Sequence, residues 1–284
     1  MAEWRKQDPG ESAIIYHYPG GDIDIIASSD GGFRPPGWER SDRWGPTDRQ
    51  GREAGKKAEG DDMLRSMRRA RAKLRRLALS NRFDYFVTLT FDQTRIDRYD
   101  PQVITRALNT WCDNMARRAG LQYILVPERH KDGALHFHGF MRGDGLRVVA
   151  SGHYTQPGPA AEPQPVYNLS QWRLGFSTAI PLYGDYARAV AYVCKYIGKQ
   201  DGQRPMGRWY YSGGGLAEPP KEYVSLEYNE LRAAYPEARE MEIPGKKLLV
   251  IHAKMEENEH VKVEIDGKRS TEETIDGDSA EPGI

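Results

Sequence analysis

The chain has 284 residues, which is enough for one large or two small domains with a sizeable hydrophobic core. Its 41 basic and 41 acidic residues cancel, which excludes a net attraction of the whole molecule to polyanions. The two cysteines do not form the pattern of a disulfide framework, and no apolar stretch is long enough to cross a membrane. We therefore expect a protein of the reducing cytoplasm.

Residues 1–60 are predicted to form a loosely ordered arm, because they are rich in Gly, Pro, Asp and Arg. The exception is the segment AIIYHYPGGDIDIIA at residues 13–27. Its two runs of β-forming residues flank Pro19-Gly20-Gly21, a pattern that predicts a small hairpin.

A basic helix is expected at residues 61–80, where Asp61 and Asp62 precede the run MLRSMRRARAKLRR and would cap its first turn. Cationic side chains surround most of this helix. It is therefore either a solvated surface helix or a contact for a phosphate backbone. The residues that would make such a contact are Arg68, Arg69, Arg71, Lys73, Arg75 and Arg76.

A compact domain is predicted over residues 81–215. Its first strand is FDYFVTLTF at residues 83–91, in which apolar residues alternate with Phe86, Thr88 and Thr90. A helix follows from Asp100-Pro101 to Gly120, with Pro at its first position and Gly after its last. Apolar residues recur along it at helical spacing and form its buried stripe: Ile104, Leu108, Trp111 and Met115.

The segment ERHKDGALHFHG, at residues 128–139, lies between two β-forming stretches and predicts a hairpin. His136 and His138 share one face of their strand, because successive side chains alternate. A three-residue loop that ends in a left-handed Gly133 places Glu128 opposite His136. This register gathers one carboxylate and two imidazoles on one face of a sheet. Taken alone, a His-x-His pair is also compatible with a solvated strand face.

The second half of the domain is predicted to hold a long surface loop, a strand, a helix and a short strand. The complete order is strand, helix, hairpin, strand, helix, strand. Strands joined by hairpins imply an antiparallel sheet, so we expect an α+β fold of the split βαβ kind with helices packed on one face. The four expected segments are residues 143–170, 172–183, 184–200 and 207–213.

The helix at residues 184–200 carries two phenols and two ammonium groups on one stripe. Such a stripe is compatible with packing. A phenol with a pKa of about 10 is a poor nucleophile at neutral pH, but cations and a metal favour its anion and neutralise a phosphodiester. The residues of the stripe are Tyr192, Lys195, Tyr196 and Lys199.

The group of Glu128, His136 and His138 suits a divalent metal. A carboxylate is the hard oxygen ligand that Mg²⁺ and Mn²⁺ prefer, and imidazole nitrogen is tolerated better by Mn²⁺. We therefore expect Mn²⁺ or Mg²⁺, with open coordination positions for the oxygens of a phosphate.

Three segments occur in the order FVTLTF, ERHKDGALHFHG and YVCKYIGK, and they resemble the three motifs of the HUH endonucleases. They are most similar to the rolling-circle replication initiators of plasmids and small single-stranded-DNA phages. The resemblance covers about Phe83 to Gly215. It implies an RNA-recognition-like fold and an enzyme that nicks and rejoins single-stranded origin DNA.

The resemblance also implies roles for single residues. His136 and His138 match the metal-binding histidines, and Glu128 matches their acidic third ligand. Tyr192 matches the nucleophile that forms a 5′-phosphotyrosine and frees the 3′-OH for rolling-circle synthesis.

The pair Tyr192 and Lys195 corresponds to the Y-x-x-K motif of these initiators. Tyr196 and Lys199 repeat the pattern, as in the two-tyrosine initiators of the small icosahedral phages. We favour Tyr192 as the first nucleophile, and Tyr196 is either a second nucleophile or a packing residue.

The sequence contains no G-x-x-x-x-G-K-[ST] loop, so we expect a host helicase to unwind the DNA and a host polymerase to extend it. Two alternatives remain. A single-strand transposase would use the same chemistry, and a non-catalytic RNA- or DNA-binding module would use the histidines and tyrosines as base contacts. Further DNA contacts are expected where side chains can stack on displaced bases, although an ordinary edge strand explains them as well. These residues are Arg208, Trp209 and Tyr210.

The C-terminal part is predicted to add accessory elements at residues 216–255. Residues 256–284 form an acidic tail with the composition of disorder.

Overall fold

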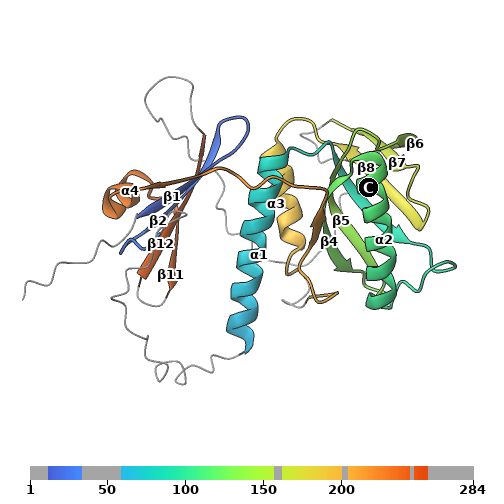
Figure 1. Cartoon of the computed structure of the whole chain (residues 1–284), viewed down its shortest axis with the longest axis horizontal. Helices are drawn as coiled ribbons and strands as arrows, with labels where there is room; N and C mark the ends of the chain where they lie inside the picture. Colours follow the sequence, from blue (N-terminus) through green and yellow to red (C-terminus); the bar gives the residue numbers. More distant parts are fainter. Residues whose placement is uncertain (1–11, 34–58, 157–161, 200–203, 244–245, 255–284) are drawn as a thin grey trace, which may run out of the picture. The chain divides into compact units, whose positions relative to one another are not determined.

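The computed structural model describes residues 12–33, 59–156, 162–199, 204–243 and 246–254. These residues fall into two compact units, one built from residues 56–218 and the other from residues 1–55 together with 219–276 (Figure 1). No helix in the described ranges is both long and apolar enough to cross a bilayer. The acidic stretch 256–284 and much of the predicted arm, residues 1–11 and 34–58, lie outside the described residues.

The unit of residues 56–218 is built on a seven-stranded sheet in which every neighbouring pair is antiparallel. The α+β class and the antiparallel sheet expected from the sequence are confirmed. The strand order across the sheet is β6-β7-β8-β3-β5-β4-β9. Its strands are β3 (Tyr85–Phe91), β4 (Gln122–Arg129), β5 (Leu135–Arg142), β6 (Val148–Tyr154), β7 (Pro165–Leu169), β8 (Gly175–Pro181) and β9 (Tyr211–Gly213).

One face of this sheet packs against α2 (Pro101–Ala119). The Asp100 carboxylate accepts hydrogen bonds from the first free amides of α2, and Gly120 ends it at φ 60°, as the sequence predicts. The apolar half of β3 and the stripe of α2 meet in a single core. Its members include Val87, Leu89, Phe91, Ile104, Leu108, Met115, Leu125 and Phe137, all buried.

The opposite face of the sheet packs against α3 (Tyr186–Tyr196), which in turn packs on α1 (Glu59–Asn81). The ring of Phe86 contacts that of Tyr192 at 5.8 Å, and the Tyr186 hydroxyl donates a hydrogen bond of 2.8 Å to the Ala78 carbonyl. Figure 1 shows the sheet between α2 and α3. The helices therefore cover both faces, not one as expected, because Phe86 and Phe140 make the second face apolar as well.

Four expected elements differ in extent. α1 begins at Glu59, so Asp61 and Asp62 lie within its first turn instead of capping it. Helix α3 and the strands β8 and β9 are each shorter than the segments predicted for them.

The segment of residues 143–170 is not a surface loop throughout, because it contains β6 and β7. Val148 and Val149 are β-branched and pair with Leu169 and Asn168. The Gly- and Pro-rich composition that suggested a loop is concentrated at residues 156–165, between the two strands.

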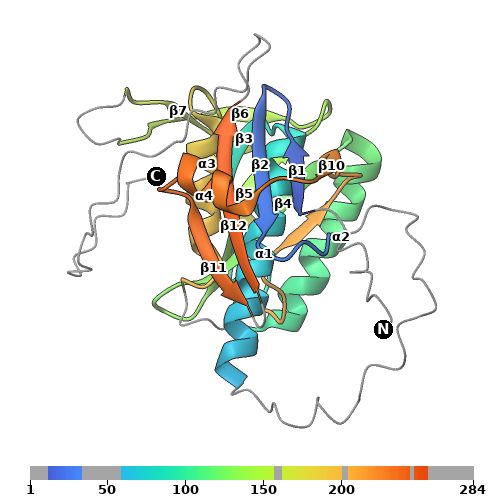
Figure 2. The same ribbon diagram turned by 90° about the vertical axis from the view of Figure 1, so that its left-hand side faces the viewer.

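The other unit is a five-stranded antiparallel sheet in the order β10-β1-β2-β12-β11, shown in Figure 2. Alternate residues of β2 and β12, such as Ile25 and Ile251, form a core with side chains of α4 (Tyr228–Ala234). Its strands are β1 (Ala13–His17), β2 (Asp22–Ser28), β10 (Lys221–Val224), β11 (Arg239–Ile243) and β12 (Lys246–Lys254).

The hairpin expected around Pro19-Gly20-Gly21 is present as β1 and β2. It is not an isolated feature of an arm, because β1 pairs with β10 and β2 pairs with β12. Residues 216–255, expected to add accessory elements, supply three of the five strands of this sheet. Local sequence patterns carry no information about such distant pairing.

Candidate metal centre

The hairpin of β4 and β5 has the register expected from the sequence. Glu128 lies opposite His136, and Val126 lies opposite His138. The turn is closed by a hydrogen bond of 2.7 Å from the His130 amide to the Ala134 carbonyl, which leaves three residues in the loop. Gly133, the last of them, has a φ of 89°, a conformation that glycine adopts without strain.

This register brings Glu128, His136 and His138 into one group on the sheet face that α3 covers. The Nε2 atoms of His136 and His138 lie 3.0 and 2.8 Å from Oε2 of Glu128. One ligand atom from each of the three residues lies within 4.8 Å of the others. Glu128 and His138 are 8% and 5% exposed, so the group is largely withdrawn from solvent.

The electrostatics of the group favour a charged carboxylate and a neutral imidazole. Burial raises the pKa of the Glu128 carboxyl, but hydrogen bonds from His136, His138 and Lys199 outweigh it and hold the pKa below its ordinary value. Burial lowers the pKa of His138, more than its hydrogen bond to Glu128 raises it. Both protonation states are those in which these side chains bind metal ions.

A further residue, Thr88 of β3, contacts the other side of the His138 ring. Its Oγ1 atom lies 3.1 Å from Nδ1, and Thr88 is the register partner of His138. When Nε2 binds a cation, Nδ1 must carry the proton and donate it to a hydrogen bond. The Thr88 hydroxyl can accept that bond, and it can donate instead when the proton is on Nε2.

The three residues fit a divalent metal ion. They offer one hard oxygen and two nitrogen donors that converge from neighbouring strands, and the carboxylate is ionised. Mg²⁺ and Mn²⁺ both accept carboxylate oxygen, and Mn²⁺ accepts imidazole nitrogen more readily. The group can therefore hold a metal ion, whose identity the donor set alone does not fix.

The two tyrosines of α3 face this group. The Tyr196 ring stacks on the His138 ring, with centroids 4.1 Å apart and planes 15° from parallel. The Tyr196 hydroxyl donates a hydrogen bond of 2.8 Å to that of Tyr192. The two phenol oxygens therefore lie together beside the candidate metal ligands, on the helix that the sequence predicted to carry them.

The two lysines of the predicted stripe lie in different surroundings. Lys195 is exposed in the last turn of α3. Lys199 lies beyond the helix, and its Nζ atom is 2.8 Å from Oε1 of Glu128 and 5.2 Å from the centre of the Tyr196 ring. The structure thus brings Lys199 to the carboxylate, and it does not bring Lys195 there.

The position of Lys199 depends on where α3 ends. The helix ends at Tyr196, and Gly198 turns the chain at a φ of 86°. The Arg71 guanidinium of α1 donates two hydrogen bonds to the Ile197 carbonyl, one of them at 2.8 Å from Nε. An arginine from a neighbouring helix therefore binds the free carbonyl end of α3.

The residues expected to contact DNA are distributed over two regions. Trp209 is 8% exposed, and its Nε1 donates a hydrogen bond of 3.0 Å to the Ser66 hydroxyl, so it is not open to stacking on bases as expected. Tyr210 is half-buried and burial raises its pKa, while Arg208 is exposed with its guanidinium over the Tyr211 ring.

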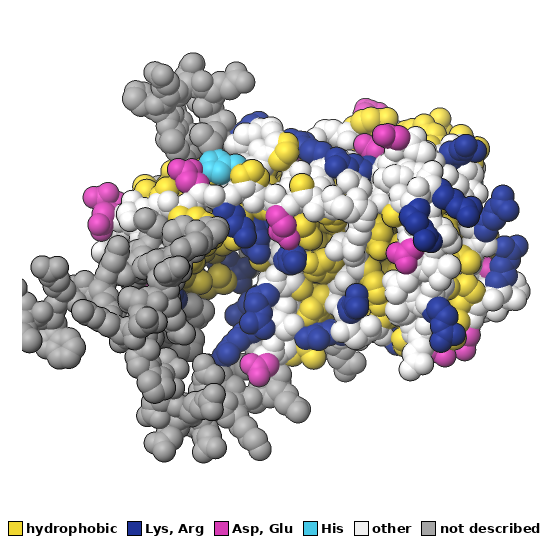
Figure 3. Space-filling model, viewed as in Figure 1, with side chains coloured by type: hydrophobic (Ala, Val, Ile, Leu, Met, Phe, Trp, Pro, Cys, Tyr) yellow, Lys and Arg dark blue, Asp and Glu magenta, His cyan; other side chains and the backbone are white. Residues whose placement is uncertain are grey.

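On α1, the residues Arg68, Arg69 and Lys73 are exposed, and Lys73 lies 3.6 Å from the Glu218 carboxylate. Arg71, Arg75 and Arg76 are partly buried. Figure 3 shows Lys and Arg side chains along this helix. The exposed residues remain available for a phosphate backbone, whereas Arg71 is used within the fold.

Neither cysteine belongs to the candidate centre. Both are free thiols. Burial raises the pKa of Cys112 to about 12 and that of Cys194 to about 11. Each thiol is therefore protonated at neutral pH, which excludes both as thiolate nucleophiles in this fold.

Sequence reasoning missed the parts played by Thr88 and Arg71. Thr88 could have been found, because the alternation of residues 83–91 puts a hydroxyl on the face opposite the apolar core. Gly198 also signalled the end of α3. Nothing in the basic run distinguishes Arg71 from the arginines around it, since its role depends on how two helices pack.

Residues 84–201 match a family model of replication-associated proteins of the ORF2 type. The matched segment begins one residue before β3 and includes every candidate metal ligand, both tyrosines and both lysines. No curated protein and no solved structure matches the chain. The family match supports a replication-associated protein of the rolling-circle initiator type.

Proposed function

We propose that this chain initiates rolling-circle replication by nicking and rejoining single-stranded DNA at an origin. One observation carries the proposal: the phenols of Tyr192 and Tyr196 lie together on the helix whose Tyr196 ring stacks on His138 of the Glu128–His136–His138 group. A metal-ligand group and a pair of nucleophile candidates are the two halves of a site for phosphodiester transfer.

In this mechanism Glu128, His136 and His138 would hold a divalent metal ion, with Mn²⁺ or Mg²⁺ as the candidates. When bound, the ion supplies Lewis-acid polarisation of a phosphate oxygen. One phenol loses its proton and its oxygen attacks the phosphorus in line. The bond from phosphorus to the 3′ oxygen breaks, and that oxygen takes up a proton. The products are a 5′-phosphotyrosine and a free 3′-OH.

The hydrogen bond between the phenols supports Tyr192 as the first nucleophile. The Tyr192 oxygen accepts this bond at 2.8 Å, and a hydrogen bond to the charged form of a group favours that form. Tyr196 then serves as the second nucleophile, which attacks the next phosphodiester when strands are rejoined. Lys199 supplies positive charge beside both Glu128 and Tyr196.

The partners that follow from this reaction are single-stranded origin DNA, a host helicase and a host polymerase. The sequence has no nucleotide-binding loop of the G-x-x-x-x-G-K-[ST] type, so unwinding would come from another protein. The free 3′-OH is the primer that a host polymerase extends.

The test is adduct formation with a randomised library of single-stranded oligonucleotides labelled at the 3′ end. After incubation with Mn²⁺, the label should migrate with the protein on a denaturing gel, because the tyrosine keeps the downstream fragment. EDTA should abolish the adduct, and so should the double variant Tyr192→Phe/Tyr196→Phe. Sequencing of the captured fragments would give the cleavage site.

Two results would contradict the proposal. An adduct that forms equally well in EDTA would refute the role of the metal group. A chain that binds the oligonucleotides with the same affinity in the double tyrosine variant, and forms no adduct as wild type, would instead be a non-catalytic binding module.

A further inference from the structure

The candidate metal group belongs to a row of residues that crosses four strands. Glu128 of β4 pairs with His136 of β5, His136 pairs with Thr90 of β3, and Thr90 pairs with Phe176 of β8. Register partners in an antiparallel sheet point to the same face. Phe176 therefore lies on the metal face, two strand spacings or roughly 10 Å from His136.

Phe176 is the most exposed large apolar side chain of the described residues, with 76% of its surface open to solvent. Farther along β8, the side chains on the same face are less exposed, since Thr178 and Ile180 are partly buried. Helix α3 covers that part of the face, where Phe86 contacts Tyr192. The aromatic ring of Phe176 thus lies uncovered at the end of the row that leads to the metal ligands.

Positive charge lies at the same end of the sheet. Phe91 at the end of β3 pairs with Gly175 at the start of β8, and the Arg95 guanidinium donates a hydrogen bond of 2.7 Å to the Arg173 carbonyl next to this pair. The side chains of both arginines are exposed. Two cations beside an exposed ring suit a strand that presents phosphates and bases alternately.

We propose that Phe176 is a stacking platform for one base of the DNA strand whose phosphate lies at the Glu128–His136–His138 group. This inference rests on the proposed function and adds a nucleotide subsite to it. At about 3.4 Å for each base of a stacked strand, a separation of roughly 10 Å places that base within about three nucleotides of the cleaved bond. Arg95 and Arg173 would face its phosphates.

The subsite is tested by combining a protein variant with an abasic scan of the DNA. The substrate is an oligonucleotide recovered from the adduct assay, carrying a single abasic sugar at each of the three positions on either side of the cleaved bond. Binding is measured by fluorescence anisotropy in the Tyr192→Phe/Tyr196→Phe background, so that no strand is cut. Phe176→Ala and Phe176→Trp are compared with the unaltered residue.

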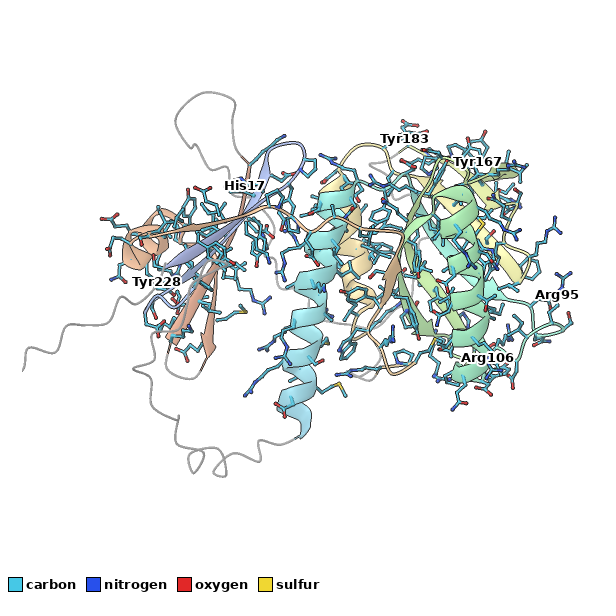
Figure 4. All side chains as sticks on the ribbon, viewed as in Figure 1. His17, Arg95, Arg106, Tyr167, Tyr183 and Tyr228 are labelled. Atoms are coloured by element: carbon cyan, nitrogen blue, oxygen red, sulfur yellow. The ribbon has the colours of Figure 1, made fainter. Side chains whose placement is uncertain are left out.

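We expect Phe176→Ala to weaken binding of intact DNA about tenfold, the effect of losing one base stack, and Phe176→Trp to retain it. One abasic position should weaken binding to the same degree with Phe176 present and no further with Phe176→Ala. The matched control is Tyr183→Ala, which removes an aromatic ring of similar exposure, 71%, beyond the other end of β8. Figure 4 labels Tyr183 and Arg95, which lie toward opposite ends of this sheet.

The outcomes separate this inference from the function on which it rests. If adducts form normally but Phe176→Ala binds intact DNA as tightly as Tyr183→Ala does, the stacking platform is refuted and the nicking function stands. Equal further losses at every abasic position in Phe176→Ala would refute it too. If the wild-type chain neither binds single-stranded DNA nor forms an adduct, the proposed function itself fails.

Discussion

At the scale of single residues, the candidate centre depends on how each ligand is oriented. His136 and Glu128 orient each other directly, whereas the His138 ring is held between the Glu128 carboxylate and the Thr88 hydroxyl. The identity of the ligands could be predicted from the sequence, because strand alternation and a three-residue turn fix their register. The groups that orient them could not, because they come from elements distant in sequence.

Replacement of Thr88 tests whether this hydroxyl orients the metal ligand. Loss of such a partner usually costs about 10- to 100-fold in metal affinity. We expect Thr88→Val to weaken Mn²⁺ binding by that factor in isothermal titration calorimetry, because Nδ1 of His138 then has no partner for its proton. Thr88→Ser keeps the hydroxyl and should restore affinity. Equal affinity of Thr88→Val and wild type would show that Thr88 serves only the packing of β3.

Lys199 should compete with the metal for the same carboxylate. Its ammonium group lies 2.8 Å from Oε1 of Glu128 and neutralises the charge that attracts a cation. Lys199→Met is therefore expected to tighten Mn²⁺ binding several-fold while lowering the rate of adduct formation. Lys195→Met, in an exposed lysine that the structure does not bring to Glu128, is the control and should leave Mn²⁺ affinity unchanged. Weaker Mn²⁺ binding in Lys199→Met would contradict this account.

At the scale of elements, the sequence predicted best where the signal is local. Asp100-Pro101 and Gly120 define the ends of α2, and the Lys131-Asp132-Gly133 turn defines the hairpin. The end of α3 was misjudged by several residues, because its periodic pattern continues through Gly198 although the helix does not. The second covered face was also missed, since a phenylalanine among threonines on β3 does not reveal which helix it contacts.

The end of α3 provides a prediction with a control on the same helix. Gly198→Ala forces a side chain into a left-handed conformation at φ 86°, and its Cβ would clash with the Met67 side chain. We expect a loss of about 1–3 kcal/mol in stability and a larger loss of adduct formation, because Lys199 follows directly. Gly184→Ala, at φ 77° before the start of α3, has no atom within 4 Å of the added Cβ.

Gly184→Ala should therefore show a similar loss of stability in urea denaturation with adduct formation retained. Equal activity in the two variants would show that the exit of the chain from α3 does not position Lys199.

At the scale of the whole molecule, the candidate centre belongs entirely to one contiguous unit, residues 56–218. The sequence revealed this unit through its motifs, but the second unit was divided between a predicted arm and predicted accessory elements. The pairing of Ile25 with Ile251 in the second sheet explains why, since the two strands come from opposite ends of the chain. Each half of that sheet lacks its partners when read alone.

This division predicts how fragments behave. A fragment of residues 56–218 retains its whole sheet, both covering helices and every candidate ligand, so it should unfold cooperatively in urea and bind Mn²⁺ with the affinity of the full chain. Removal of residues 219–284 from the full chain should instead leave β1 and β2 without β10 and β12, and increase binding of a hydrophobic dye. A fragment 56–218 with no cooperative transition would refute the independence of this unit.

The pairing of β2 with β12 also sets an order of events on the ribosome. At about 5–20 residues per second, β12 leaves the ribosome roughly 10–40 seconds after β2. During that interval the segment with the nuclease motifs is translated in full and can fold, while the N-terminal hairpin waits with both of its edges open. Nascent chains of this protein should therefore engage chaperones through the hairpin of β1 and β2, and release them only when translation is almost finished.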